Sequence, residues 1–343
     1  MLSRWQGGGL FAMAAARFGA GAVGLVLLLG LAGCHGPDRA GPTPLLSPAE
    51  ATAATRQLWA DREAALQSRN APGIRKHDEG VAAAIDLANW SPKPGSQVLL
   101  SRRSVDRIEV AVPRQVTWPV RFLAAVTSDS VETDPELTLL LLSRRDQRSP
   151  WRLAWSADLA ANTGYPAFAL DDDGYTLPAP PDAELAMATG RASAALAGYL
   201  TRLTADKKLT AAAGEFTPGK FTYGHVAADR AEISTARENG DRASTRWRAS
   251  EAPAFGVRLA DGGALVVGAV EREHTKTYKW LGGLYQDDGR TRLDPRLAPG
   301  AYAGLTTISL HAVAIHVPPA GPGRRPAVLA ETSGKVNVKG RRQ

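Results

Sequence analysis

Residues 255–267 read FGVRLADGGALVV. Two runs rich in β-forming residues flank Asp261-Gly262-Gly263, which is typical of a tight hairpin turn because glycine tolerates positive φ angles. The second run continues as a long predicted strand from Ala264 to Trp280, and a further strand is expected from Leu305 to Val317. The region around this hairpin is therefore expected to form a curved antiparallel sheet.

The residues that precede this sheet predict helices. Asp182 can cap a helix whose inner face comprises Leu185, Thr189, Ala192, Leu196, Tyr199, Leu200 and Leu203. A shorter helical stretch is expected from Asp206 to Ala213. Short strands are then expected at residues 231–236, 243–249 and 254–259.

The first half of the chain has the same order of elements. Ser47-Pro48-Ala49-Glu50 reads as a capping box with proline at the first helical position, and the helix is expected to reach about Arg69. A second helix follows, with Ile74, Val81 and Ile85 on one face. From Val98 onward the pattern predicts strands, notably at residues 108–112, 116–126, 136–142 and 151–155.

Residues 162–181 separate the two halves and are rich in glycine and proline. Their Asp171-Asp172-Asp173-Gly174 lacks the alternating acidic ligands and terminal glutamate of a calcium-binding loop, so the segment is predicted to be a linker or turn. The predicted fold class is α+β, with two tandem domains at residues 47–161 and 182–320. Each has N-terminal helices packed on a curved antiparallel sheet. Residues 321–343 are expected to be a partly disordered C-terminal segment.

The N-terminus has the features of an export signal. A basic stretch with Arg4 and Arg17 precedes an apolar run from Phe18 to Leu31. The sequence Leu31-Ala32-Gly33-Cys34 then matches every position of a lipobox, so residues 1–33 resemble a bacterial lipoprotein signal peptide.

This resemblance implies that Cys34, the only cysteine, carries a diacylglycerol after cleavage. The added acyl chains give stable membrane anchoring, whereas the apolar run is shorter than the roughly 20 residues of a comfortable transmembrane helix. Residues 34–46 are expected to be a flexible tether. The predicted location is the extracytoplasmic face of the cell membrane. The alternatives are an ordinary secretory signal with a chance cysteine, or a retained transmembrane helix.

The order of helices and long strands resembles the ketosteroid-isomerase-like cone fold. Two such units behind a lipobox resemble a group of uncharacterised actinobacterial lipoproteins, and the resemblance covers most of residues 47–318. It implies tandem cone-fold domains. Because this fold hosts enzymes, binding modules and interaction domains, the resemblance does not select an activity.

The charge of the chain indicates which classes of partner are expected. Without residues 1–33 the chain has 39 basic and 34 acidic residues, a mild excess of +5. This excess could favour an anionic membrane surface or cell-envelope polymer, although a solvated surface that mixes both signs is the favoured explanation. No cluster of basic residues is interleaved with aromatic residues, so nucleic acid is not an expected partner.

A tentative pocket is predicted in the second half. On the strand from Ala264 to Trp280, alternation places Arg272, His274 and Tyr278 on one face. If this face lines the mouth of a cone, His274 and Tyr278 could contact a ligand, and Arg272 or Lys276 could hold an anion. His225, in an aromatic loop, could rim the same pocket. The alternative is an edge strand whose charges discourage aggregation.

The remaining histidines and acids give weaker signals. His311 and His316 lie five residues apart on one strand and point to opposite faces, so they cannot share a metal ion from that strand. His77 is expected on a helix surface. Asp106 and Glu109 are candidates for a carboxylate base by position alone. No metal-binding or nucleophile motif is present, so no metal ion or cofactor is expected and catalytic residues remain unassigned.

These observations favour a non-enzymatic, membrane-anchored lipoprotein that acts as a binding or protein-interaction module. The alternative is an extracytoplasmic small-molecule-binding protein or enzyme that uses a cone pocket in the second domain. A solute-binding protein of a transporter is less compatible, because such proteins alternate strands and helices around parallel sheets.

Overall fold

The computed structural model describes residues 42–342 except 69, 90–103, 130–135, 161–162, 207, 210–213, 280–283, 287–296 and 299. Within the chain, Pro42–Gln343 form one compact unit. Leu31–Cys34 and most of the expected tether lie outside the described residues. Among the helices that the structure describes, none is both long and apolar enough to cross a membrane.

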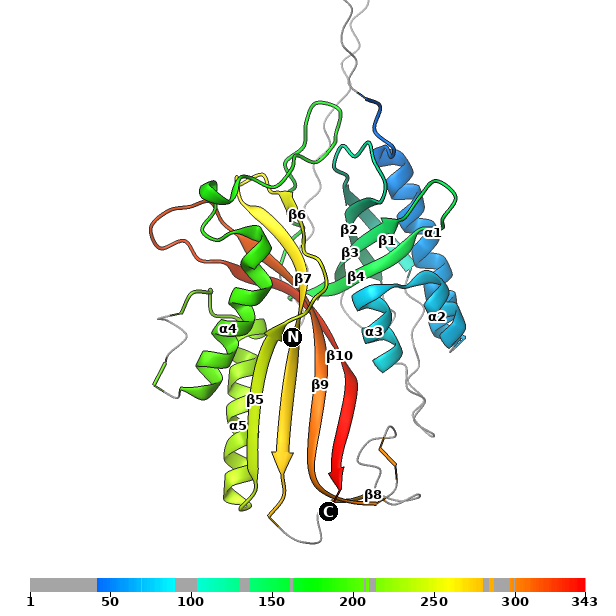
Figure 1. Cartoon of the computed structure of the whole chain (residues 1–343). Helices are drawn as coiled ribbons and strands as arrows, with labels where there is room; N and C mark the ends of the chain where they lie inside the picture. Colours follow the sequence, from blue (N-terminus) through cyan, green and yellow to red (C-terminus); the bar gives the residue numbers. More distant parts are fainter. Residues whose placement is uncertain are drawn as a thin grey trace, which may run out of the picture. The chain divides into compact units, whose positions relative to one another are not determined.

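In the first half, the described residues form three helices and four strands, which Figure 1 labels. They are α1 (Pro48–Gln67), α2 (Ala71–His77), α3 (Gly80–Asn89), β1 (Ser104–Ala111), β2 (Val120–Asp129), β3 (Glu136–Arg144) and β4 (Arg152–Leu159). The second half contains the remaining helices and strands. They are α4 (Ala192–Ala205), α5 (His225–Glu238), β5 (Arg242–Ala249), β6 (Phe255–Arg258), β7 (Ala264–Thr277), β8 (Leu284–Gln286), β9 (Gly300–Val317) and β10 (Ala327–Arg342).

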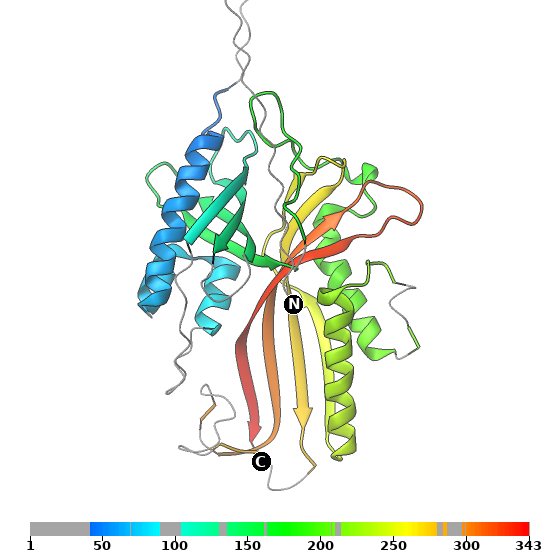
Figure 2. The same ribbon diagram turned by 180° about the vertical axis from the view of Figure 1, so that it is seen from behind.

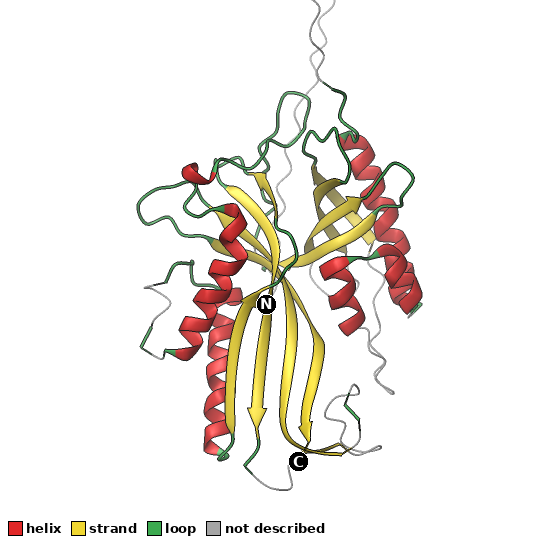
Figure 3. Ribbon diagram, in the orientation of Figure 1, coloured by secondary structure: helices red, strands yellow, loops and turns green. Residues whose placement is uncertain are grey.

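All ten described strands belong to one antiparallel sheet. Its order is β1-β2-β3-β4-β10-β9-β7-β5, with β6 paired to β7 and β8 paired to β9. The α1–α3 helices lie beside β1–β4, and α4 and α5 lie along β5 and β7 (Figures 2 and 3). Separate helices and an antiparallel sheet make the protein α+β, which confirms the predicted fold class.

The two predicted halves share both this sheet and a core. Strand β10 joins them: it pairs with β9 along almost its whole length and with β4 at Ala330–Leu159 and Glu331–Asp158. One buried cluster includes Val81 and Leu123 from the first half together with Leu265 from the second. The halves are therefore parts of one compact unit rather than separate sheets.

The expectation of a partly disordered C-terminal segment is wrong for residues 327–342, which form β10. Burial along this strand places Ala330, Gly334 and Val338 against the rest of the molecule. The polar residues between them belong to a paired strand: Ser333, Lys335 and Asn337 are exposed, whereas the side chain of Glu331 is buried.

The strand predicted at residues 231–236 is also wrong, because this segment lies within α5. Ile233 and Thr235 favour strands locally. The helix is favoured because it places three polar side chains on one face, where each binds a residue of the sheet: His225, Asp229 and Glu232. Tertiary contacts thus override local propensity.

Other helix boundaries follow from local hydrogen bonds. The capping box of α1 is confirmed: Glu50 N–H donates to Ser47 Oγ at 3.3 Å, and Ser47 N–H donates to Glu50 Oε2 at 2.8 Å. Asp182 does not cap a long helix. It accepts from the backbone N–H of Thr189 at 2.9 Å, and α4 begins at Ala192. The segment expected to be helical from Asp206 to Ala213 lies largely outside the described residues.

The predicted linker packs against both halves. Isolated bridges join Thr176 to Pro113, Phe168 to Leu259 and Pro178 to Val257. The Asp171–Gly174 segment forms a turn in which Gly174 has φ +80°, and Arg114 binds Asp171 and Asp173. Its carboxylates are thus occupied by an arginine, which agrees with the interpretation of this segment as a turn.

We predict that Ala330→Asp destabilises both halves together. Ala330 is fully buried where β4, β10 and β9 meet, so the substitution buries an unpaired carboxylate, at a cost of several kcal/mol. Urea unfolding of residues 42–343, followed by tryptophan fluorescence and circular dichroism, should give one transition at a lower midpoint. Lys339→Asp, at an exposed position of the same strand, should change the unfolding free energy by less than about 0.5 kcal/mol. Two separate transitions in Ala330→Asp would contradict a shared fold.

Candidate metal centre

Three elements bring His225, His311 and Glu331 together. His225 is the first residue of α5, His311 lies on β9 and Glu331 lies on β10. In the β9–β10 register His311 is opposite Ser333. Glu331 is two residues from Ser333, so it projects from the same face of the sheet as the diagonal neighbour of His311. Helix α5 covers this face and supplies His225.

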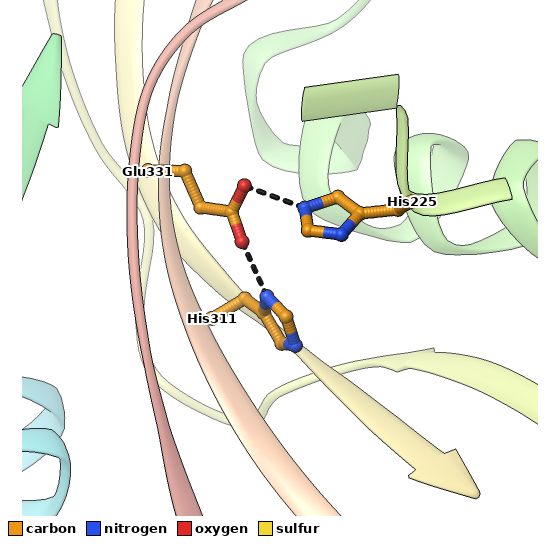
Figure 4. A group of neighbouring side chains, drawn as sticks. All are labelled: His225, His311 and Glu331. Carbon is orange, nitrogen blue, oxygen red and sulfur yellow. Dashed lines mark hydrogen bonds and ion pairs between the residues drawn. The ribbon is translucent and has the colours of Figure 1, made fainter. Parts of the chain in front are cut away.

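The carboxylate of Glu331 lies between the two imidazole rings (Figure 4). Its Oε2 is 2.6 Å from His225 Nε2, and its Oε1 is 2.5 Å from His311 Nδ1. The two rings meet edge to face, with their centroids 5.3 Å apart. One ligand atom from each residue can be chosen so that all three lie within 4.8 Å of one another.

Burial and hydrogen bonding set the charges of this cluster. Burial by itself would raise the pKa of Glu331, but the hydrogen bonds from His225 and His311 lower it to about 2. Burial lowers the pKa of His311, so its ring is neutral at pH 7 and donates one N–H to Glu331. The site therefore has an ionised carboxylate at neutral pH.

The second ring nitrogen of His311 has no partner. Nε2 is buried and makes no hydrogen bond within the described part of the chain. The side chains of His311 and Glu331 are each 6% exposed, whereas that of His225 is 28% exposed. The cluster is thus buried on the sheet side and reaches solvent along His225.

Trp247 of β5 holds the two rings in place. Its indole lies 5.4 Å from the His225 ring and 4.8 Å from the His311 ring, measured between centroids. Trp247 Nε1–H donates to the buried carboxylate of Asp229 at 3.0 Å. Asp229 is one helical turn after His225. Helix α5 therefore positions both His225 and the carboxylate that holds Trp247 against it.

Arg272 and His274, two residues of the predicted pocket, meet at this helix. Arg272 Nε donates to Asp229 Oδ1 at 2.8 Å, and its Nη2 donates to Glu232 Oε2 at 2.7 Å. His274 Nδ1 lies 3.4 Å from the same Glu232 oxygen and 2.9 Å from the hydroxyl of Thr245. Helix α5 therefore covers the face that sequence alternation assigned to Arg272 and His274.

Tyr278 is not joined to this group by any contact of the described residues. Its ring lies 5.1 Å from Lys276 Nζ, and its backbone N–H donates to Ala303. His225, placed in a loop by the sequence interpretation, instead begins α5 directly after the π-helical turn Lys220–Gly224. The structure thus links His225 to Arg272 and His274 through one helix and leaves Tyr278 apart.

The other candidates lie elsewhere. His316 binds Asp261 of the hairpin at 2.9 Å, and Glu109 pairs with Arg107. Asp106 is exposed on β1. Neither of these two acids lies in a buried apolar environment of the kind that a catalytic carboxylate base needs.

The donor set of the cluster fits a transition-metal ion. Two imidazole nitrogens and one carboxylate suit zinc and other first-row divalent ions, and zinc sites with three protein ligands leave a fourth position for water. Glu331 is already ionised, which is the form of a carboxylate that binds a metal ion. The described residues therefore include three side chains that could together hold a metal ion, which no motif in the sequence indicates.

Sequence reasoning missed Glu331 because it lies in the segment expected to be disordered. The signal that could have found it is the alternation in residues 327–338, AVLAETSGKVNV, which is compatible with a strand. His311 was considered only together with His316. Its partners come from helix α5 and strand β10, and a pattern within one strand cannot reveal them.

We predict that His311→Gln weakens the pH dependence of stability between pH 5 and 6.5. Because the folded-state pKa of His311 is lowered, an unfolded chain takes up a proton below about pH 6.5 that the folded chain does not, so stability falls as pH falls. Removing the imidazole should lower this slope by up to about 1.4 kcal/mol per pH unit, the value for one proton. The measurement is urea unfolding at several pH values. Asn337→Gln, exposed on β10, should keep the wild-type slope, and an unchanged slope in His311→Gln would contradict the assignment.

Comparison with known proteins gives one match. No curated protein and no solved structure matches the chain. A family model described as a domain of unknown function, DUF8094, matches residues 42–340. This range covers β1 to β9 and most of β10, and it includes His225, His311 and Glu331. The chain therefore belongs to the DUF8094 family.

Proposed function

We propose that the protein is a membrane-anchored extracytoplasmic lipoprotein whose folded part is a binding module for a divalent transition-metal ion. The observation that carries the metal proposal is the position of Glu331 between His225 and His311, with the donor atoms within 4.8 Å of one another. The anchoring proposal rests on the sequence Leu31-Ala32-Gly33-Cys34 and on the expected tether behind it. We also propose that the protein is related to the uncharacterised actinobacterial lipoproteins with cone-fold domains.

The cluster is arranged to hold an ion firmly. Its ligands come from a helix and two paired strands, and Trp247 fixes both imidazoles. Rigid elements of this kind keep ligands close to their binding geometry. The negative charge of Glu331 also offsets part of the positive charge of a divalent ion in a buried place.

Because the side chain of His225 is partly exposed, an ion bound there could also bind a ligand from outside the protein. A fourth ligand on that side could be water or a group from a protein or cell-envelope molecule. Such a site would connect the metal ion to the expected role as an interaction module. Without a bound ion, the same three residues would form a hydrogen-bonded lock between α5 and the sheet.

We predict that zinc binds residues 42–343 with a stoichiometry of one, and that His225→Gln, His311→Gln and Glu331→Gln each weaken binding by more than about tenfold. Isothermal titration calorimetry with zinc chloride measures the affinity, and thermal unfolding verifies that each variant is folded. His274→Gln removes a neighbouring imidazole outside the cluster and should keep the wild-type affinity. Equal loss in His274→Gln, or no zinc binding by the wild type, would refute the metal site.

Anchoring has its own test. In a bacterial host grown with an alkyne fatty acid, the full chain should become labelled, and mass spectrometry should find a lipid-modified Cys34 at the new N-terminus. Cys34→Ala should remove the label, because no other cysteine is present. Ser47→Ala serves as the control and should remain labelled. An unlabelled wild-type chain would contradict lipidation, whatever the outcome of the zinc titration.

A further inference from the structure

A second site lies on the opposite side of the sheet from the histidine cluster. A half-open cavity of about 350 Å³ is lined by residues of both halves, including Leu141 of β3, Trp155 of β4 and Val267 of β7. Ala252 and Pro253, between β5 and β6, close it from the second half. Its volume falls within the range of roughly 300–1,000 Å³ that is usual for small-molecule sites.

Two polar side chains lie next to each other in the wall of this cavity. Arg121 of β2 is directly opposite Ser143 of β3 in the strand register, so both side chains project from the same face. Ser143 is buried, yet its hydroxyl has no hydrogen-bond partner among the described residues. Arg121 is half-buried, and its guanidinium has no carboxylate or carbonyl partner there either.

A half-buried guanidinium without an ion-pair partner among the described residues keeps its donors available for an anion in the pocket. The planar fork of arginine donates two parallel hydrogen bonds to a carboxylate, and a neighbouring hydroxyl can donate a third. Arg145 and Glu79 pair at 3.5 Å in the same cavity, so their charges offset each other. The remaining charge is the single positive charge of Arg121, which matches a monoanion.

The other walls are apolar and fixed. Val81, Leu141 and Val267 line the cavity and belong to the core that both halves share. Trp155 Nε1–H donates to the backbone carbonyl of Gly268 at 2.7 Å, so the indole cannot rotate away. A ligand that fills this space therefore needs an apolar body as well as an anionic head.

From this arrangement we infer that the cavity binds an amphipathic monocarboxylate, with the carboxylate on Arg121 and Ser143 and the apolar body against Trp155 and Leu141. The site does not depend on the proposed metal centre, because it lies on the other face of the sheet and shares no residue with it. Loss of either activity would leave the other intact.

The test is calorimetric titration of residues 42–343 with dodecanoate and, as a neutral probe of the same length, dodecanol. Dodecanoate should bind with a stoichiometry of one and more tightly than dodecanol. Arg121→Gln should weaken dodecanoate binding by at least about tenfold and leave dodecanol binding unchanged. Arg246→Gln, which removes an exposed arginine of β5, should bind both probes like the wild type.

A second variant tests the cavity itself. Ala252→Phe places an aromatic ring in the lining and should abolish the binding of both probes without lowering the thermal unfolding temperature. The inference is overturned if wild-type protein binds no dodecanoate, if Arg121→Gln binds it as tightly as the wild type, or if Arg246→Gln loses as much affinity as Arg121→Gln. Zinc titration of the same variants should be unaffected, which separates this site from the metal centre.

Discussion

Strand β10 enters the sheet between β4 and β9, and its backbone hydrogen bonds are the connection on which both halves of the molecule depend. Without it, β4 and β9 would each present an open edge of unpaired N–H and C=O groups. The insertion also buries Ala330 in the shared core and places Glu331 beside two histidines. Sheet continuity and the candidate site therefore arise from adjacent residues of one strand.

The two candidate sites lie on opposite faces of the sheet. On one face, helix α5 supplies His225, Asp229 and Glu232, which partner Glu331 and Arg272. On the other face, the cavity with Arg121 and Ser143 opens between the halves. On the first face, Glu331 hydrogen-bonds to both histidines, and among the described residues the buried His311 Nε2 has no partner. On the second face, Glu79 pairs with Arg145, while the guanidinium of Arg121 has no ion-pair partner among the described residues. The first arrangement suits a small cation and the second an organic anion.

Sequence patterns predicted the elements whose signals are local. The capping box at Ser47 and the hairpin at Asp261–Gly263 depend on neighbouring residues, and so they could be recognised. The pairing of β10 with β4 joins residues as far apart as Asp158 and Thr332, 174 positions along the chain, and no local pattern encodes it. The α5 segment was misassigned for the same reason: its polar stripe makes sense only with the sheet beside it. Of the tentative site, Arg272 and His274 were correctly placed on one face, but the helix that covers them could not be predicted.

The place of β10 in chain order has a consequence for how the protein is made. The other described strands all precede it in the chain, so the sheet cannot become continuous between the two halves until β10 has been synthesised. A chain shortened before residue 327 would lack the strand that closes the sheet and also the carboxylate of the histidine cluster. The pairing of β10 is thus coupled to completion of the site.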